Sequence, residues 1–203
     1  MSLQIGILAL QGDFQEHAQK IELLGHKSIE IRRGKELEQI DALIIPGGES
    51  TTIAKLEDAA SHFTFAEADT KPLFDLIKDK VVAGMPVWGT CMGSIVLAKQ
   101  IEGSVQGRIG LMDITVRRNA FGPQIASSEV ELHIPKLGEL PFPGIFIRAP
   151  LFIHAEKNIE ILCEYSGGFV MARQDNMLAT AFHPEITNDT RVHEYFIDLI
   201  KRK

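Results

Sequence analysis

The sequence contains few of the residues that cross-link or staple small domains. It has two cysteines among 203 residues, Cys91 and Cys163, and neither lies in a CxxC pair or near a histidine at metal-ligand spacing. Two such cysteines cannot form a disulfide framework, and a structural zinc site is not expected. A chain of this length buries a sufficient core without cross-links. We therefore expect a single domain over residues 1–203.

Long apolar runs and an excess of positive charge are also absent from the sequence. No apolar run approaches the roughly 20 residues that cross a bilayer. The first apolar run has no basic segment before it and ends at Gly12 and Asp13, which argues against a signal peptide. The formal net charge of -6 argues against nucleic-acid binding, which rests on lysine and arginine contacts. We expect a cytoplasmic protein with neither a membrane nor a nucleic acid as partner.

Short β-type runs and helix-type segments alternate through the first part of the chain. This alternation is typical of a parallel sheet with helices on its faces. The expected strands are residues 4–10, 27–31, 42–45 and 85–88, and the expected helices are residues 13–25 and 72–82. We therefore expect an α/β fold, with a flavodoxin-like, doubly wound and largely parallel sheet that carries helices on both faces.

The second half of the chain has more β character and ends in an amphipathic segment. Its expected strands are residues 113–117, 128–134, 144–147, 159–165, 168–173 and 177–182, and its expected helices are residues 94–100 and 189–203. In the last segment Val192, Phe196 and Ile200 share one helical face, so this helix should dock on the domain. Residues 58–70 follow no pattern, and we expect them to form an excursion near the site.

One cysteine stands where an apolar strand meets a helical segment, in the sequence GTCMG at residues 89–93. A nucleophile on a tight strand-to-helix turn needs small neighbours, and a helix N-terminus favours the thiolate. A buried structural cysteine is the alternative, because free cysteine is among the most buried residue types. The context favours a nucleophile at Cys91, whereas Cys163 lies inside a β-type run and is expected in the core.

His183, Pro184 and Glu185 follow an apolar strand near the end of the sequence. Proline favours extended backbone for the residue before it, and side chains two apart on an extended segment project to the same side. His183 and Glu185 can then touch. A carboxylate beside an imidazole fixes its tautomer and stabilises the imidazolium that forms when histidine takes a proton from a thiol. A turn histidine without a catalytic role is the alternative.

The third notable segment, LIIPGGESTT at residues 43–52, is a buried strand that ends in a glycine pair. Glycines let backbone N–H groups face a ligand, as an oxyanion hole requires. A phosphate-binding loop is the alternative. The sequence lacks the GxxxxGK[ST] pattern and its lysine, which argues against that alternative.

Together IIPGGEST, WGTCMG and AFHPE resemble, in order and spacing, the core motifs of class I (triad) glutamine amidotransferases. The segments LQGD, RNAFG and FIRAP, which begin at residues 10, 118 and 146, narrow the resemblance to the glutaminase subunits of pyridoxal 5′-phosphate synthases. The resemblance extends from Ile5 to the final helix. The sequence departs from the family pattern at Met92, where alanine is usual, and at residues 58–70, which look longer than their counterpart.

The resemblance implies a glutaminase that hydrolyses L-glutamine to L-glutamate and ammonia. Its catalytic triad would be Cys91, His183 and Glu185, and its oxyanion hole the backbone N–H groups of Gly48 and Met92. The residues that it implies for glutamine binding are Gly47, Gly48, Glu49, Arg118, Ile147 and Arg148. An arginine suits this role because its planar fork can pair with the α-carboxylate of the substrate, and surface ion pairing is the alternative for both arginines.

The resemblance also implies a partner, and it implies no cofactor or metal. The ammonia would pass to the pyridoxal 5′-phosphate synthase subunit in a hetero-oligomeric complex for vitamin B6 biosynthesis, with Gln11 and Gly12 taking part in docking. Three alternatives remain: a class I glutaminase for another acceptor, such as imidazole glycerol phosphate synthase; a cysteine-elbow hydrolase or chaperone of the same architecture; and a non-catalytic scaffolding subunit. The remaining histidines are expected to be surface or core residues, namely His17, His26, His62, His133, His154 and His193.

Overall fold

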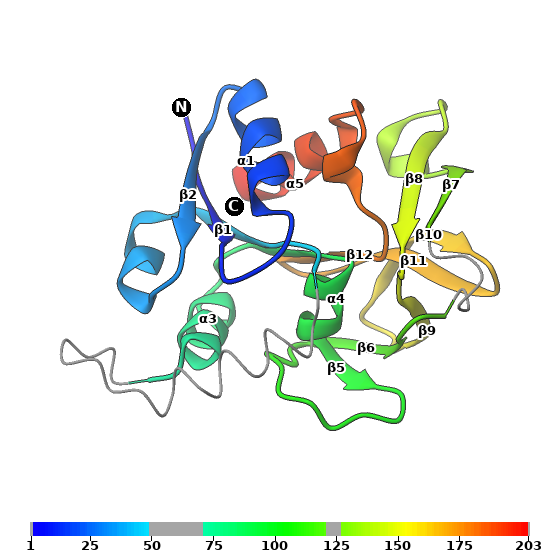
Figure 1. The fold of residues 1–203 in the computed structure, drawn as a ribbon, viewed down its shortest axis with the longest axis horizontal. Coiled ribbons are helices and arrows are strands. Elements are labelled where there is room, and N and C mark those ends of the chain that lie inside the picture. Colours follow the sequence, from blue (N-terminus) through cyan, green and yellow to red (C-terminus); the bar gives the residue numbers. More distant parts are fainter. Residues whose placement is uncertain (1, 49–70, 121–126, 203) are drawn as a thin grey trace.

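The computed structural model describes residues 2–48, 71–120 and 127–202 (Figure 1). The excursion expected at residues 58–70 lies outside these ranges. Within them, no helix is long and apolar enough to cross a membrane. The largest element is a 10-stranded sheet, and a separate two-stranded sheet lies beside it.

One half of the large sheet is parallel throughout. Its strands, in spatial order, are β2 (Lys27–Ile31), β1 (Gln4–Leu8), β3 (Ala42–Ile45), β4 (Val87–Thr90) and β12 (Met177–Thr180). The strands β3, β4 and β12 are buried at every position. Continuous burial is expected of parallel strands covered on both faces, and it explains the unbroken apolar runs in the sequence.

The other half of the sheet is mainly antiparallel. It continues from β12 through β11 (Gly168–Gln174), β9 (Leu151–Ala155) and β6 (Met112–Arg117) to β5 (Ala98–Ile101), while β10 (Glu160–Tyr165) pairs with β11. Only the outermost pair, β5 and β6, is parallel in this half. The two-stranded sheet is an antiparallel pair of β7 (Ser127–Leu132) and β8 (Phe142–Ile147).

Helices cover both faces of the sheet, which confirms the expected α/β fold class. In Figure 1, α1 (Phe14–Leu23) and α5 (Arg191–Lys201) lie on one face, and α3 (Leu73–Val82) and α4 (Met92–Leu97) lie on the other. Three short 3-10 helices complete the described elements: η1 (Gly34–Gln39), η2 (Pro135–Leu137) and η3 (Pro184–Ile186).

Two expectations about the middle of the chain were wrong. The helix expected at residues 94–100 ends at Leu97, and strand β5 begins with the next residue. The stretch contains good helix formers, but it pairs with β6 at the edge of the sheet, and this pairing decides its conformation. Strand β9 was not expected at all, because it follows directly on the FIRAP segment without a turn signal of its own.

The last helix docks through the face that its sequence pattern predicts. Val192 and Phe196 are fully buried, and the Phe196 ring lies 5.5 Å from the ring of Trp88 on β4. Trp88 is itself fully buried, and its indole Nε1 donates to Thr180 Oγ1 at 3.1 Å. The helix therefore packs against Trp88 of the central strand β4, and Trp88 in turn is tied to β12.

Truncating this contact should lower the stability of the whole domain. We expect Phe196→Ala to reduce the free energy of unfolding by about 3–5 kcal/mol, because it removes a large buried ring and leaves a cavity. Urea denaturation followed by circular dichroism measures the change. Leu23→Ala is the control, since this residue of α1 is 72% exposed and should cost less than about 0.5 kcal/mol. Equal losses in the two variants would contradict the packing role of Phe196.

Candidate active site

Cys91 occupies the tight turn between β4 and α4 that the sequence predicts. Its φ of 46° and ψ of -103° are unusual for a residue with a side chain, and such strain is common at functional sites. The backbone N–H of Cys91 donates to Thr180 O at 2.8 Å, which fixes the turn to the neighbouring strand. The residue is only 5% exposed.

The two glycines around Cys91 are required by close backbone contacts. A Cβ added at Gly93 would lie 1.9 Å from Ile45 O, and one at Gly89 would lie 2.4 Å from the carbonyl carbon of Gly93. Real Cβ atoms do not approach other atoms so closely. The GTCMG sequence is thus the one that lets this turn sit against the end of β3.

His183 and Glu185 are in contact, but not through the extended backbone that we expected. His183 Nδ1 lies 2.7 Å from Glu185 Oε1, while Pro184 to Ile186 form the 3-10 turn η3. Pro184 takes the first position of this turn, where its missing N–H costs nothing. The backbone N–H of His183 donates to Ile145 O at 2.8 Å, so β8 holds the turn from outside.

Burial and hydrogen bonding act on the pKa of His183 in opposite directions. Burial lowers it, but hydrogen bonds with Asp13, Cys91 and Glu185 outweigh this effect and raise the pKa well above its usual value. The pKa of Glu185 is raised, because burial outweighs the favourable contact with His183. The cluster can accept and hold a proton on His183, as a histidine paired with a thiol must do.

Asp13 contributes a second carboxylate to this cluster, which the sequence did not predict. It precedes α1 at the position where its side chain could cap the helix, but it makes no capping hydrogen bond. Its Oδ2 lies instead 3.4 Å from His183 Nδ1, and this contact lowers the pKa of Asp13. Asp13, His183 and Glu185 are also the one group in the described ranges with ligand atoms spaced for a metal ion. The expectation of no metal or cofactor stays a prediction.

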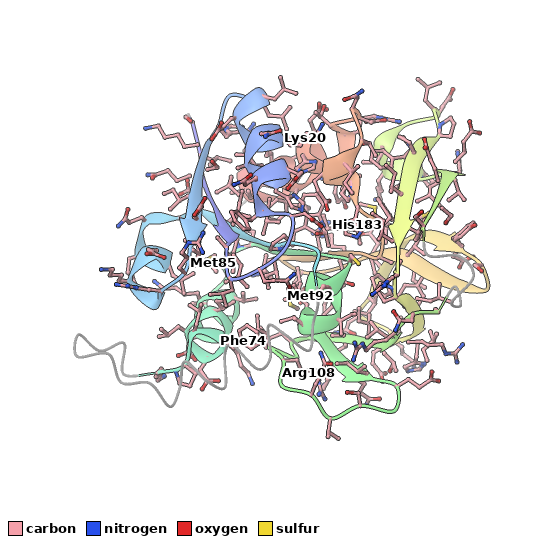
Figure 2. All side chains as sticks on the ribbon, in the orientation of Figure 1. Lys20, Phe74, Met85, Met92, Arg108 and His183 are labelled. Atoms are coloured by element: carbon pink, nitrogen blue, oxygen red, sulfur yellow. The ribbon has the colours of Figure 1, made fainter. Side chains whose placement is uncertain are left out.

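The glycine pair after β3 lies against His183, which is labelled in Figure 2. A Cβ at Gly47 would lie 2.4 Å from His183 Cε1, and Gly48 has a φ of 148°. The loop of the LQGD segment packs on this turn from the other side, where a Cβ at Gly12 would lie 1.7 Å from Gly47 O. The Gln11 side chain faces Gly48, 2.7 Å from where a Cβ would stand. Glu49 lies outside the described residues.

The two arginines expected to bind substrate lie on adjoining turns. A hydrogen bond of 3.3 Å from Ala120 N to Ala149 O joins the turn after β6, with Arg118, to the turn after β8, with Arg148. Arg148 is exposed and has a φ of 46°, and Arg118 Nη1 donates to Gln106 Oε1 at 3.1 Å.

Ile147 ends β8, and its carbonyl oxygen lies 3.7 Å from the Cys91 thiol. Together with the hydrogen bond from His183 to Ile145, this contact places β8 along one side of the cysteine. The structure therefore brings the end of β8 to Cys91, with Arg148 next in the chain.

Two further histidines lie near the cluster: His17 is next to Glu185, and His193 is next to His17. We expected them to be surface or core residues without a role, and the sequence did not reveal their contacts with the site. His17 Nε2 lies 3.3 Å from Glu185 Oε2, and His17 Nδ1 lies 3.1 Å from His193 Nε2. Both residues have no exposed surface. The available signal was their place on apolar helix faces, since His17 precedes Ile21 by one turn of α1 and His193 precedes Ile197 by one turn of α5.

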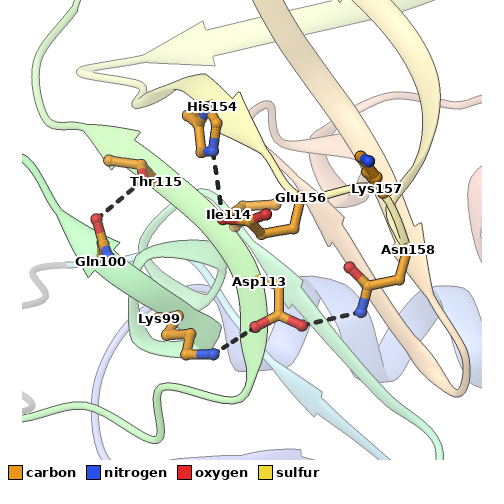
Figure 3. Close-up of a pocket in the computed structure, with 9 residues that line it drawn as sticks. All are labelled: Lys99, Gln100, Asp113, Ile114, Thr115, His154, Glu156, Lys157 and Asn158. Carbon is orange, nitrogen blue, oxygen red and sulfur yellow. Dashed lines mark hydrogen bonds and ion pairs between the residues drawn. The ribbon is translucent and has the colours of Figure 1, made fainter.

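A shallow pocket elsewhere on the molecule contains none of the candidate site residues (Figure 3). It lies over the edge formed by β5, β6 and β9, and Asp113 is at its centre. The Asp113 carboxylate is paired with Lys99 Nζ at 2.8 Å and with Asn158 Nδ2 at 2.9 Å. Its central carboxylate is thus neutralised by its neighbours and lies apart from Cys91.

Known proteins resemble this chain over nearly its full length. Residues 7–202 match the model of the SNO glutamine amidotransferase family. The chain is 48% identical over 198 residues to a protein of Carboxydothermus hydrogenoformans named pyridoxal 5′-phosphate synthase subunit PdxT, covering 98% of both chains. It is 50% identical to the protein of that name from Moorella thermoacetica, covering 98% of this chain and 100% of the other. A crystal structure described as a glutamine amidotransferase superposes with a TM-score of 0.86 at 41% identity, covering 97% of this chain and 98% of that chain.

The buried histidines predict how stability depends on pH. Burial lowers the pKa of His193 to about 3, whereas an unfolded chain binds this proton near pH 6.5. Acid therefore favours the unfolded chain between these values, and stability rises with pH through this window. We expect His193→Gln to reduce the slope of unfolding free energy against pH, between about pH 4.5 and 6, by about 1.4 kcal/mol per unit.

Urea denaturation at several pH values measures this slope. His154→Gln serves as the control, because its side chain is 63% exposed and makes only a surface ion-pair contact. A slope for His193→Gln equal to that of the native chain would show that the imidazole is not buried in its neutral form.

Proposed function

Since this chain belongs to the SNO glutamine amidotransferase family, we propose that it hydrolyses L-glutamine and delivers the ammonia to a pyridoxal 5′-phosphate synthase subunit. The observation that carries the proposal is the arrangement of a strained, buried cysteine beside an imidazole that is paired with a carboxylate. Near full-length identity of 48–50% to the two relatives named above supports the same substrate and partner.

In the proposed reaction the Cys91 thiolate attacks the side-chain amide carbon of glutamine. His183 takes the thiol proton and gives it to the departing nitrogen, so that ammonia leaves and a thioester remains. His183 then removes a proton from water, which attacks the thioester, releases L-glutamate and restores the thiol. Glu185 orients the imidazole and stabilises its charge in both steps, a role that its 2.7 Å contact with Nδ1 supports.

The tetrahedral intermediate in each step carries an oxyanion, for which we propose the backbone N–H groups of Gly48 and Met92. Met92 is the first residue of α4, directly after the nucleophile, and its side chain is buried. A backbone donor does not depend on the side chain, so methionine in place of the usual alanine is compatible with this role. Gly48 faces Gln11 and directly follows Gly47, which lies against His183, and this position supports it as the second donor.

For glutamine binding we propose Gly47, Gly48, Glu49, Arg118, Ile147 and Arg148. The 3.7 Å contact between the Ile147 carbonyl and the thiol supports a substrate lying along the end of β8. The adjoining turns of Arg118 and Arg148 support a cationic end of the site, where a guanidinium can pair with the α-carboxylate.

The proposal also covers the domain organisation, the cellular location and the complex of the enzyme. We propose one domain over residues 1–203, a cytoplasmic location and a hetero-oligomeric complex in which the loop with Gln11 and Gly12 contacts the ammonia acceptor. The packing of this loop on the Gly47 turn supports a link between docking and the site. Ammonia released into water would be protonated and lost as a nucleophile, so hydrolysis is useful only when the acceptor is docked.

Replacing the proposed nucleophile should abolish hydrolysis. We expect Cys91→Ala to reduce glutamate release from glutamine by about 10³-fold or more, because no other group can form the thioester. A coupled glutamate dehydrogenase assay measures the rate. Cys163→Ala is the matched control: burial raises the pKa of that thiol to about 11, and it lies at His133 O, away from the cluster. Activity retained in Cys91→Ala would refute the mechanism.

The acceptor subunit should raise the rate of hydrolysis. We expect glutamate release by the native chain to increase when a pyridoxal 5′-phosphate synthase acceptor subunit is added. The acceptor subunit of imidazole glycerol phosphate synthase, added at the same concentration, is the control and should have no effect. A rate indifferent to the first subunit, or raised by the second, would point to a different acceptor.

A further inference from the structure

The catalytic carboxylate of Glu185 has two oxygens, and only one of them serves His183. Oε1 accepts from His183 Nδ1, while Oε2 is fully buried and has no aligned hydrogen bond within the described residues. His17 Nε2 lies 3.3 Å from Oε2, and both side chains are completely buried. A buried carboxylate oxygen needs a donor, and the His17 ring is placed to supply one.

The hydrogen-bond network assigns the tautomer of His17. An ionised carboxylate only accepts, so the hydrogen of His17 belongs on Nε2, where it faces Glu185 Oε2 and also Thr90 Oγ1 at 3.2 Å. Nδ1 is then an acceptor, and His193 Nε2, 3.1 Å away, must donate to it. This order leaves His193 Nδ1 as a lone-pair acceptor, and that atom has no partner within the described residues.

Burial keeps both rings neutral. It is the largest cause that lowers the pKa of His17 well below its usual value, followed by the charges of His193 and His183, and it also lowers the pKa of His193. A neutral donor can support the carboxylate of Glu185 without competing with His183 for the proton that the reaction moves.

The two rings are held by the strand that presents the nucleophile. The rings of His17 and His193 lie edge-on to Trp88 at centroid distances of 5.4 and 4.8 Å. Trp88 and Thr90 belong to β4, and Cys91 is the next residue. An apolar residue would fill this space at less cost, so two buried imidazoles in series are better explained by a functional role than by packing.

We propose that His17 is a positioning residue of the catalytic triad and donates a hydrogen bond from Nε2 to Glu185 Oε2. His193 fixes the tautomer of His17 in which this bond forms. This inference rests on the proposed glutaminase function for its kinetic consequence. Its structural content, the tautomer and its effect on His183, stands independently of the substrate.

Three variants separate positioning from packing in the full chain bound to its acceptor subunit. His17→Leu removes the donor, His17→Gln restores an amide N–H at the reach of Nε2, and His193→Phe leaves Glu185 untouched but frees the His17 tautomer. We expect His17→Leu to lower kcat by about 10- to 100-fold with KM nearly unchanged, as for residues that orient a reacting imidazole through its partner. His17→Gln should recover most of this loss, and His193→Phe should cost less than His17→Leu.

Thermal unfolding of each variant distinguishes a kinetic effect from loss of fold. His17→Leu and His193→Phe remove buried imidazoles from the same cluster, so similar changes in Tm with unequal changes in kcat support positioning. A kcat for His17→Leu equal to that of an active native enzyme, or a loss in kcat that follows Tm alone in all three variants, overturns the proposal.

Nuclear magnetic resonance of ¹⁵N-histidine-labelled protein tests the proposal without glutamine. We expect His17 of the native chain to keep the neutral Nε2–H tautomer from pH 5 to 9, and the titration of His183 to shift to lower pH in His17→Leu. The titratable groups around this cluster are Asp13, His17 and Lys20 at or in the first helix, Cys91 after β4, His183 and Glu185 after β12, and His193 in the last helix.

The spectra also separate the two proposals. If the native chain and its complex release no glutamate, the proposed function fails while the spectra still decide the role of His17. A charged His17, an Nδ1–H tautomer or an unshifted His183 overturns the inference, whether or not the enzyme is active.

Discussion

The parallel register of β3, β4 and β12 is the constraint on which the rest of the site depends. Ile45 pairs with Gly89, and Thr90 pairs with Thr180, so the three strands end together at one edge. The glycine turn, the cysteine turn and the histidine turn all follow these carboxyl ends, where ligands bind in open α/β sheets. A register shift of one residue in any pair would move every side chain of the shifted strand to the opposite face of the sheet, and it would separate the three turns.

The parts of the site that were predictable from the sequence are those encoded in short, local segments. The Cys91 turn, the glycine pair and the contact between His183 and Glu185 each lie within a few residues, so pattern and resemblance suffice to place them. The local geometry was less predictable: residues 183–185 were expected to be extended, but Pro184 begins a 3-10 turn that still brings the two side chains together.

Contacts between distant segments explain what the sequence did not reveal. Strand β5 forms because it pairs with β6, against the helical preference of its own residues. Asp13 resembles a helix cap in sequence, and only the folded chain directs its carboxylate to His183. The contact of His17 with Glu185 joins residues 168 positions apart, and no single-sequence pattern reports such a pair. The sequence therefore predicts the reacting groups better than the groups that support them.

The histidine pair also connects the site to the order in which the chain is made. His17 lies in the first helix and His193 in the last, 176 positions apart. On the ribosome, the strand that carries Cys91 emerges long before α5, so the nascent chain has its thiol while the buried cluster lacks its final member. The Nδ1 atom of His17 gains its partner, His193 Nε2, only when synthesis of α5 is finished. Assembly of this site is thus a late event of biosynthesis, coupled to the docking of the last helix.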